Sequence, residues 1–209
     1  SQKSHRLCMK YSDHEMPQKQ LTEVFQKIIS QAGRLKKLEV ISDREGIPPE
    51  YILEVIMSQE GLAWSIRELV VECEDFSDKV ILARHFDFFQ NLEHWKIKSN
   101  KINIDDEILL RLANNQGKIR KLKSFHLSLR NPQVSNSSVQ KLLRAQFPEL
   151  TDLLLDFEGS DINDEAFKSL IANRFENLKN VKNFPFDCQN TDVTEKCQNK
   201  LELLYKIKR

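Results

Sequence analysis

The chain has 209 residues, of which 40% are hydrophobic and 30% are charged, and its formal net charge at pH 7 is only +1. This length and apolar content suit a single domain with a continuous core. The near-zero net charge argues against broad capture of nucleic acid through its phosphates, which needs a basic excess. No apolar run is long enough to cross a membrane, and residues 1–16 lack the apolar stretch of a signal peptide.

Short apolar segments and helical stripes alternate along the rest of the chain. Residues 17–34 predict a first helix. Six later segments, 26 to 31 residues apart, share the pattern Leu-x-x-apolar-x-apolar. They begin at Leu35, Ile66, Leu92, Leu122, Leu150 and Leu178. Because these segments are short and rich in Val, Ile and Leu, they predict strands.

Between the strands, apolar residues recur at i, i+3 and i+4, which predicts helices that bury one face. Ile52, Val55 and Ile56 illustrate the spacing after the first strand. Later stripes follow the second, third, fourth and fifth strands, and a last one falls within 190–209. Strands that alternate with helices predict right-handed crossovers and a parallel sheet.

The third segment carries the fullest motif, in which Leu92, Trp95, Ile97 and Asn100 fit L-x-x-L-x-L-x-x-N. It resembles the long leucine-rich repeats of ribonuclease-inhibitor-like proteins, and the resemblance covers about residues 18–208. It implies an α/β solenoid, a horseshoe of about six strand–helix units with helical caps and a parallel sheet on the concave face. The Asn position of that motif is otherwise held by Glu74, Arg130, Glu158 and Phe186. These units are therefore expected to turn less regularly.

The chain divides into four parts on this interpretation. Residues 1–16 form a polar N-terminal segment, 17–34 an N-terminal capping helix, 35–189 the repeats and 190–209 a C-terminal capping helix. Capping helices are expected because stacked repeats leave a core end exposed on each side. We expect the chain to belong to a larger protein or assembly, and we assign no oligomeric state.

The cysteines predict a reducing compartment, the cytoplasm or the nucleus. Cys8, Cys73, Cys188 and Cys197 show neither zinc-like spacing nor the clusters of extracellular repeat proteins. Free thiols are expected, and Cys188 with Cys197 is the one pair close enough in sequence to be linked across the last turn. No phosphate loop, dinucleotide fingerprint or helical pair of metal ligands occurs, so we expect no cofactor and no metal site.

The side chains between the buried strand positions are expected to face the concave side of the sheet. Counted from the first Leu of each segment, these are positions three, five, seven and eight. Charge comes in bands, with Glu68 and Glu72 on the second strand, Lys96 and Lys98 on the third, and Asp152 and Asp156 on the fifth. Such bands fit either cross-strand pairing within the sheet or a patterned binding surface.

An apolar corner is expected beside these bands, at Leu129, Phe157, Phe184 and Pro185. It is either buried beneath the C-terminal cap or an exposed contact patch. With the patch exposed, the predicted partner-binding residues are His94, Lys96, Lys98, His126, Asp152, Asp156, Phe157 and Phe184.

These features favour a non-enzymatic scaffold or adaptor that binds a protein partner on the concave face, with no membrane contact. Glu68, His94 and Ser124 all stand at position three of their segments, but an open sheet face offers no oxyanion site and no pocket. We therefore expect no enzymatic activity.

Three alternatives stay open. Residues 16–28, MPQKQLTEVFQKI, match part of an F-box, which would indicate a substrate receptor of a ubiquitin ligase. Asn100 or Arg130 on the rim would suit a GTPase regulator. An RNA-binding accessory protein would use His94, Lys96, Lys98 and His126.

Overall fold

The computed structural model describes residues 6–11, 23, 35–42, 49–76, 84, 87–102, 105–115, 117–129, 133–173, 178, 180–182 and 186–208. The N-terminal capping helix expected over 17–34 lies outside these residues except for Glu23. Arg130 and almost all of the F-box-like segment 16–28 also lie outside them. No helix in the described ranges has the length and apolarity to traverse a bilayer.

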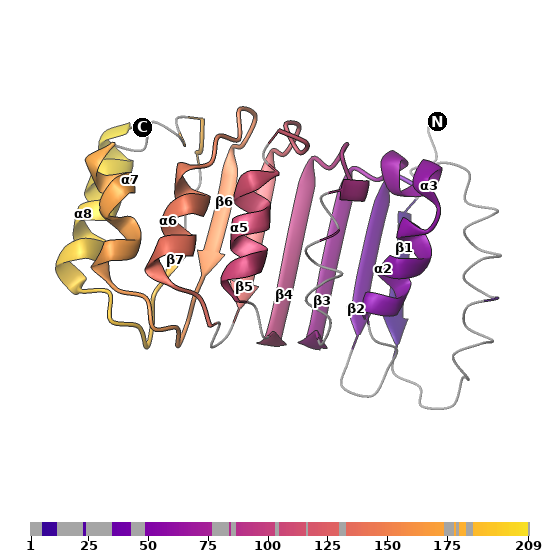
Figure 1. The fold of residues 1–209 in the computed structure, drawn as a ribbon, viewed down its shortest axis with the longest axis horizontal. Coiled ribbons are helices and arrows are strands. Elements are labelled where there is room, and N and C mark those ends of the chain that lie inside the picture. The colour runs from indigo at the N-terminus through magenta and orange to yellow at the C-terminus, as the bar shows by residue number, and fades with distance from the viewer. Residues whose placement is uncertain are drawn as a thin grey trace.

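The fold is α/β, built on a parallel sheet of seven strands whose order in the sheet is their order in the chain (Figure 1). The strands are β1 (Arg6–Tyr11), β2 (Lys37–Ser42), β3 (Glu68–Phe76), β4 (His94–Ile102), β5 (Ser124–Leu129), β6 (Asp152–Asp156) and β7 (Phe186–Asp187). Every neighbouring pair is parallel. The parallel sheet predicted from strand–helix alternation is therefore confirmed.

The labelled helices lie on the side of the sheet that faces the viewer in Figure 1. They are α2 (Pro49–Met57), α3 (Glu60–Ser65), α5 (Asp106–Asn114), α6 (Asn136–Arg144), α7 (Lys168–Ala172) and α8 (Glu195–Lys208). A 3-10 helix, η1 (Asp164–Phe167), directly precedes α7. Their apolar stripes are buried, for example Ile52 and Ile56 on α2 and Val139 and Leu143 on α6. The helices thus form one layer and the sheet the other.

Repeated backbone hydrogen bonds hold successive units in register. The carbonyl of Lys36, the second residue of its motif, accepts the amides of Arg67 (2.8 Å) and Glu68 (3.0 Å) in the next unit. The carbonyls of Arg67, Glu93 and Lys123 each accept the equivalent pair of amides. Because each strand starts at the same point of its motif, the buried positions of β2 to β6 align side by side.

The core runs continuously between the two layers. At its middle, the rings of Trp95 on β4 and Phe125 on β5 stack with centroids 4.9 Å apart and an interplanar angle of 9°. Leu69 and Leu153 occupy the same motif position on the flanking strands and are also buried. Offset-stacked aromatic pairs add stabilisation beyond the area that they bury.

A ladder of side chains links the helix starts of neighbouring units, and we refer to it below as the helix-start ladder. Its three acceptors are Asp106, Asn136 and Asp164, in chain order. Asp106 Oδ1 accepts the Ser135 amide at 2.6 Å, Asn136 Oδ1 accepts the Asn163 amide at 2.9 Å, and Asp164 Oδ1 accepts the Thr194 amide at 2.8 Å. The three donors are themselves helix caps, since each also accepts an amide from its own first turn.

The carboxyl groups of this ladder titrate below their ordinary range. Burial raises the pKa of Asp106, but the amide of Ser135 and the hydroxyls of Ser138 and Ser135 lower it further than burial raises it. Asp164 behaves alike, with burial opposed by the amide and hydroxyl of Thr194. Both carboxylates are therefore held in the ionised form by the unit that follows.

The strand β1 corrects the expectation that residues 1–16 are only a polar segment ahead of the fold. The segment RLCMKY alternates apolar and polar residues, and its register pairs Leu7 with Leu38 and Met9 with Val40. The repeat pattern missed it because the residue three before Leu7 is Ser4, whereas Leu35 stands three before Leu38. The sheet therefore has one more strand than the six that we predicted.

The last strand corrects the register predicted for the sixth segment. The structure pairs Leu155 with Phe186 and Asp156 with Asp187, three residues later in the chain than expected. The Thr151 carbonyl likewise accepts the amide of Lys182 at 2.6 Å, again three residues late. A turn closed by the Val181 amide on the Leu178 carbonyl, at 2.9 Å, precedes the strand. The sequence holds a second frame of the same pattern, V-x-x-F-x-F from Val181, which fits this register.

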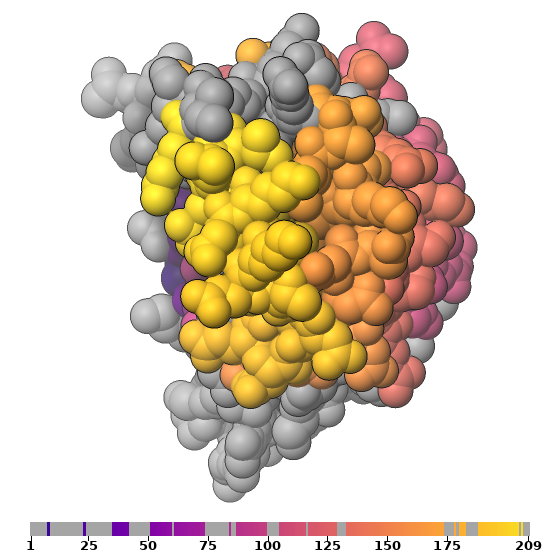
Figure 2. All heavy atoms as spheres, turned by 90° about the vertical axis from the view of Figure 1, so that its left-hand side faces the viewer, coloured from indigo at the N-terminus to yellow at the C-terminus, as the bar shows by residue number. Residues whose placement is uncertain are grey.

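The C-terminal helix expected within 190–209 is present as α8. It covers the end of the molecule beside α7, as Figure 2 shows in yellow and orange, and its Cys197 and Leu201 are buried.

All four cysteines are free, as predicted, with Cys8 exposed and the other three buried. Burial, with the nearby Asp164 carboxylate, raises the pKa of Cys197 to about 11, so this thiol stays protonated at neutral pH.

Candidate interaction surface

The side of the sheet opposite the core forms the candidate interaction surface. Along β6, Leu153 and Leu155 are buried, while Asp152, Leu154 and Asp156 are half-buried. The same alternation holds on β2, β4 and β5. Successive side chains of a strand point to opposite faces, so the half-buried set shares one face.

The predicted rows at positions three, five and seven are confirmed over β2 to β6. Row three runs Lys37, Glu68, His94, Ser124, Asp152; row five runs Glu39, Val70, Lys96, His126, Leu154; row seven runs Ile41, Glu72, Lys98, Ser128, Asp156. Neighbours within a row come from adjacent strands, which lie about 4.8 Å apart. Long polar side chains in one row are therefore within reach of one another.

Much of the charge on this face is paired across strands. Lys37 Nζ lies 3.0 Å from Glu68 and 3.1 Å from Glu39, and hydrogen bonding first to Glu68 and then to Glu39 raises the pKa of this lysine. Lys96 Nζ lies 2.5 Å from Glu72 Oε1. The Lys37–Glu68 and Lys96–Glu72 pairs join neighbouring strands, so part of the charge banding stabilises the sheet. Exposed pairs of this kind contribute only about 0–1 kcal/mol each.

The predicted acidic residues on β6 are also partly satisfied within the face. The Ser128 hydroxyl donates to Asp156 Oδ2 at 2.7 Å, and the Thr151 hydroxyl donates to Asp152 Oδ2 at 2.7 Å.

Two predicted residues differ from the rest. His94 and Lys98 on β4 are exposed, and neither side chain is hydrogen-bonded or ion-paired with another residue of the described ranges. The centre of the face thus presents an imidazole and an ammonium to solvent.

His126 lies half-buried beside this pair. The Ser124 hydroxyl lies 3.3 Å from its Nε2. Burial lowers the pKa of His126, and the nearby Lys96 and His94 lower it further, whereas Asp152 raises it. The imidazole is therefore neutral at pH 7. Row three does place Glu68, His94 and Ser124 side by side, but the serine lies against His126 rather than His94.

The lowered pKa of His126 predicts a loss of stability in mild acid. Below about pH 6.5, the ordinary pKa of histidine, the unfolded chain binds a proton that the folded protein resists. The free energy of unfolding should then fall as the pH drops through this range and level off below the folded pKa. We expect His126→Gln to remove this part of the slope, as measured by urea denaturation between pH 7.5 and 5. His94→Gln is the control and should keep most of it, because His94 is the weakest of the groups that shift the pKa of His126. An unchanged slope in His126→Gln would contradict the assignment.

Phe157 is 1% exposed and belongs to the core. At this residue, therefore, the expected apolar corner is not an exposed contact patch. Position eight was assigned to the wrong face. Cys73 and Ser99 occupy the same position and are also buried, because the strands extend far enough for the alternation to continue. Phe184, Pro185 and the side chain of Leu129 lie outside what the structure describes. In the observed register the partner of Asp156 is Asp187, whereas the predicted register would have made it Phe184.

Sequence analysis missed a second surface feature at the end of α3. Trp64 is 59% exposed, and it lines a pocket of about 400 Å³ with Gly61, Asp87, Phe88 and Gln90. The signal was present, since one of only two tryptophans fell outside every predicted stripe. Among the described residues, no cluster of three or more His, Cys, Asp or Glu side chains has a geometry that would hold a metal ion.

No family model, no curated protein and no solved structure matches this chain. The geometry of the surface is therefore the basis for assigning a function.

Proposed function

We propose that the chain is a leucine-rich-repeat solenoid that acts as a non-enzymatic protein-interaction module. On this proposal it binds a partner protein on the open face of the sheet, the concave face of the solenoid. The recurrence of the same lateral backbone bonds at the second residue of successive motifs supports the repeat assignment. The sheet order, which follows the chain, supports stacking of one unit upon the next.

The observation that carries the proposal is the state of the side chains on β4. His94 and Lys98 stand exposed and without hydrogen bonds to described residues, while two other lysines of this face, Lys37 on β2 and Lys96 on β4, are paired with glutamates. A charge that pairs with no other described residue is available to a partner. Charged groups on a binding face mainly raise the association rate and exclude wrong partners.

The partner contact should therefore centre on His94 and Lys98, with His126, Asp152 and Asp156 around it. An acidic or hydrogen-bond-accepting group on the partner would complement the Lys98 ammonium. Lys96 has a smaller direct part than the sequence suggests, because Glu72 already holds it. The free thiols support the cytoplasm or the nucleus as the compartment.

The test compares Lys98→Glu with wild type, first as baits in affinity purification from the native source and then in binding kinetics with the purified partner. We expect Lys98→Glu to slow association by about threefold to tenfold and to weaken its dependence on salt, without a change in folding. Lys200→Glu on α8 is the matched control, because it reverses one exposed lysine at the end of the molecule. It should bind like wild type.

Equal association rates for wild type and Lys98→Glu would reject the open face as the contact. The RNA alternative is separated by nuclease treatment of the purified complex. If the captured material is lost with the RNA and the salt dependence is steep, the chain is an RNA-binding protein and the proposed function is wrong.

A further inference from the structure

An exposed aromatic side chain marks a second surface, on the helix side of the sheet. The Trp64 ring is 59% exposed, although large apolar side chains elsewhere in the described core are buried. Beside it lies the pocket of about 400 Å³, which we call the Trp64 pocket. A Cβ atom built on Gly61 would meet nothing within 4 Å, so this part of the wall is open. An indole left in water beside an open pocket is a typical anchor for a partner, because Trp is over-represented among residues that dominate interfaces.

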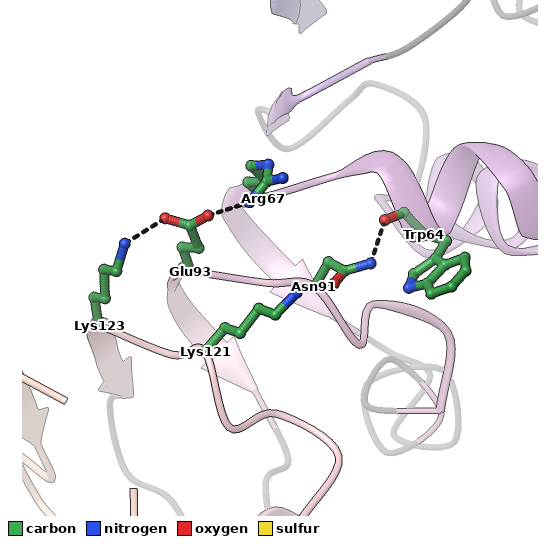
Figure 3. A network of polar contacts seen from close by, with 6 residues as sticks. All are labelled: Trp64, Arg67, Asn91, Glu93, Lys121 and Lys123. Carbon is green, nitrogen blue, oxygen red and sulfur yellow. Dashed lines mark hydrogen bonds and ion pairs between the residues drawn. The ribbon is translucent and has the colours of Figure 1, made fainter. Parts of the chain in front are cut away.

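The backbone of Trp64 is held by a polar network that Figure 3 shows. Asn91 Nδ2 donates to the Trp64 carbonyl at 3.0 Å, and Lys121 Nζ donates to Asn91 Oδ1 at 2.7 Å. Next to it, Glu93 is bound by both Arg67 and Lys123. The Lys123 ammonium, with help from Arg67 and against burial, lowers the pKa of Glu93. This network ties three successive units together and fixes the backbone that carries Trp64, so the pocket exists before any partner arrives.

The charge around the pocket is predominantly positive. The Arg84 guanidinium lies over the Phe88 ring, 5.6 Å from its centroid. Lys118 is paired with Asp87, and Lys121 reaches the Trp64 carbonyl through Asn91. Arg84 and Lys118 thus each contact a lining residue, and Lys121 binds the Asn91 side chain that holds the Trp64 carbonyl. The described lining has one carboxylate, Asp87, and Lys118 neutralises it. The patch stands out on a chain whose net charge is only +1.

We propose that the Trp64 pocket is a docking site for an acidic segment of a partner protein that inserts one apolar side chain beside Trp64 and Phe88. Its carboxylates pair with Arg84 and Lys121 on the rim, and the apolar side chain fills the space that Gly61 leaves open. Apolar burial supplies most of the affinity and the rim charges supply orientation and association rate.

A single-stranded nucleic acid would use the same cations, but the observations favour a peptide. Non-specific binding of single strands needs successive stacking platforms along a basic groove. In the described part of the chain Trp64 is the one aromatic ring that is mostly exposed. A discrete pocket with a mixed wall suits one side chain better than a row of bases.

This site goes beyond the proposed function, because it is separate from the open face of the sheet. Its residues come from α3 and from residues 87–90, which precede β4, whereas His94 and Lys98 lie on β4 itself. The two surfaces can therefore be altered independently.

The test is fluorescence anisotropy with the full chain and a labelled dodecapeptide, Glu-Glu-Leu-Phe-Glu-Glu repeated twice. Its controls are the same peptide with Lys in place of Glu, the same peptide with Ser in place of Leu and Phe, and a dodecamer of oligouridylate. We expect the acidic apolar peptide to bind best. Trp64→Ala should weaken the affinity for this peptide by at least about tenfold. Arg84→Glu and Lys121→Glu should each weaken the affinity and make the remaining binding less dependent on salt. Lys200→Glu and Lys98→Glu should bind it like wild type.

A second readout comes from the protein's own emission. The other tryptophan, Trp95, is buried, so a shift of emission on peptide binding reports Trp64, and Trp64→Phe should abolish that shift. The proposal is overturned if the acidic peptide does not bind, if the basic peptide or oligouridylate binds better, or if Trp64→Ala binds like wild type. Because Lys98→Glu tests only the open face, loss of one site leaves the conclusion about the other unchanged.

Discussion

Leu153→Ala is expected to lower the free energy of unfolding by about 2–5 kcal/mol, through lost apolar contacts and the cavity left behind. Leu153 is 4% exposed and lies on β6, where its register partner on the neighbouring β5 is Phe125. Leu154→Ala is the matched control, because it removes the same atoms from the next residue of the same strand. Leu154 is half-buried on the open face, and its loss should cost less than about 1 kcal/mol.

The comparison tests the register of the sheet. A strand that slipped by one residue would exchange its two faces and reverse the order of the two variants. Urea denaturation followed by circular dichroism measures both midpoints under one condition. Equal midpoints, or a larger loss in Leu154→Ala, would contradict the assignment of the open face on which the proposed function depends.

Phe157→Ala is expected to destabilise the fold by about 3–5 kcal/mol, the usual cost of truncating a buried phenylalanine. The ring is 1% exposed and packs in the core just beyond β6. Thermal or urea denaturation should show the loss directly. The conservative variant Phe157→Leu should recover much of the stability, because it refills most of the volume.

The result also separates a core residue from an interface residue. If Phe157 were the exposed anchor that the sequence suggested, Phe157→Ala would leave stability near wild type and accelerate dissociation of the partner. A near-wild-type denaturation midpoint would therefore contradict the structure at this position.

The regular units were predictable because the physics of their strands is local and repeated. Positions four and six of each segment must be apolar to be buried, as Leu69 and Val71 on β3 and Trp95 and Ile97 on β4 are. Once the period is known, the rows on the opposite face follow from alternation. Rows three, five and seven are therefore predictable residue by residue over β2 to β6.

The two ends of the sheet were harder to predict, because their motifs are degenerate in different ways. At β1 the leading Leu is replaced by Ser4, so the pattern has no anchor. At β7 two overlapping frames compete, one from Leu178 and one from Val181. The first frame would place Asn183 at a buried position, and an unpaired buried amide is costly. The second frame places Phe186 there, opposite Leu155.

The surface features that were missed depend on contacts between units, which no local pattern encodes. Whether Lys96 is free or paired depends on the length and direction of Glu72 on the neighbouring strand. The exposure of Trp64 arises because the helical region after β2 is broken near Ser58 and Gln59, so that α3 starts a new direction instead of continuing the stripe of α2. Such breaks change which face a residue occupies.

The helix-start ladder has a consequence for how the molecule opens. Each of its three donor amides belongs to one unit and its acceptor to the unit before, so amide hydrogen exchange at Ser135, Asn163 and Thr194 reports the separation of neighbouring units. Acid divides these junctions into two classes. Protonation of Asp106 and Asp164, below the ordinary pKa of an aspartate, weakens the bonds that they accept, while Asn136 between them does not titrate. As the pH falls through that range, the outer two junctions should loosen first. The Asn163 amide at the middle junction should then stay protected from exchange the longest.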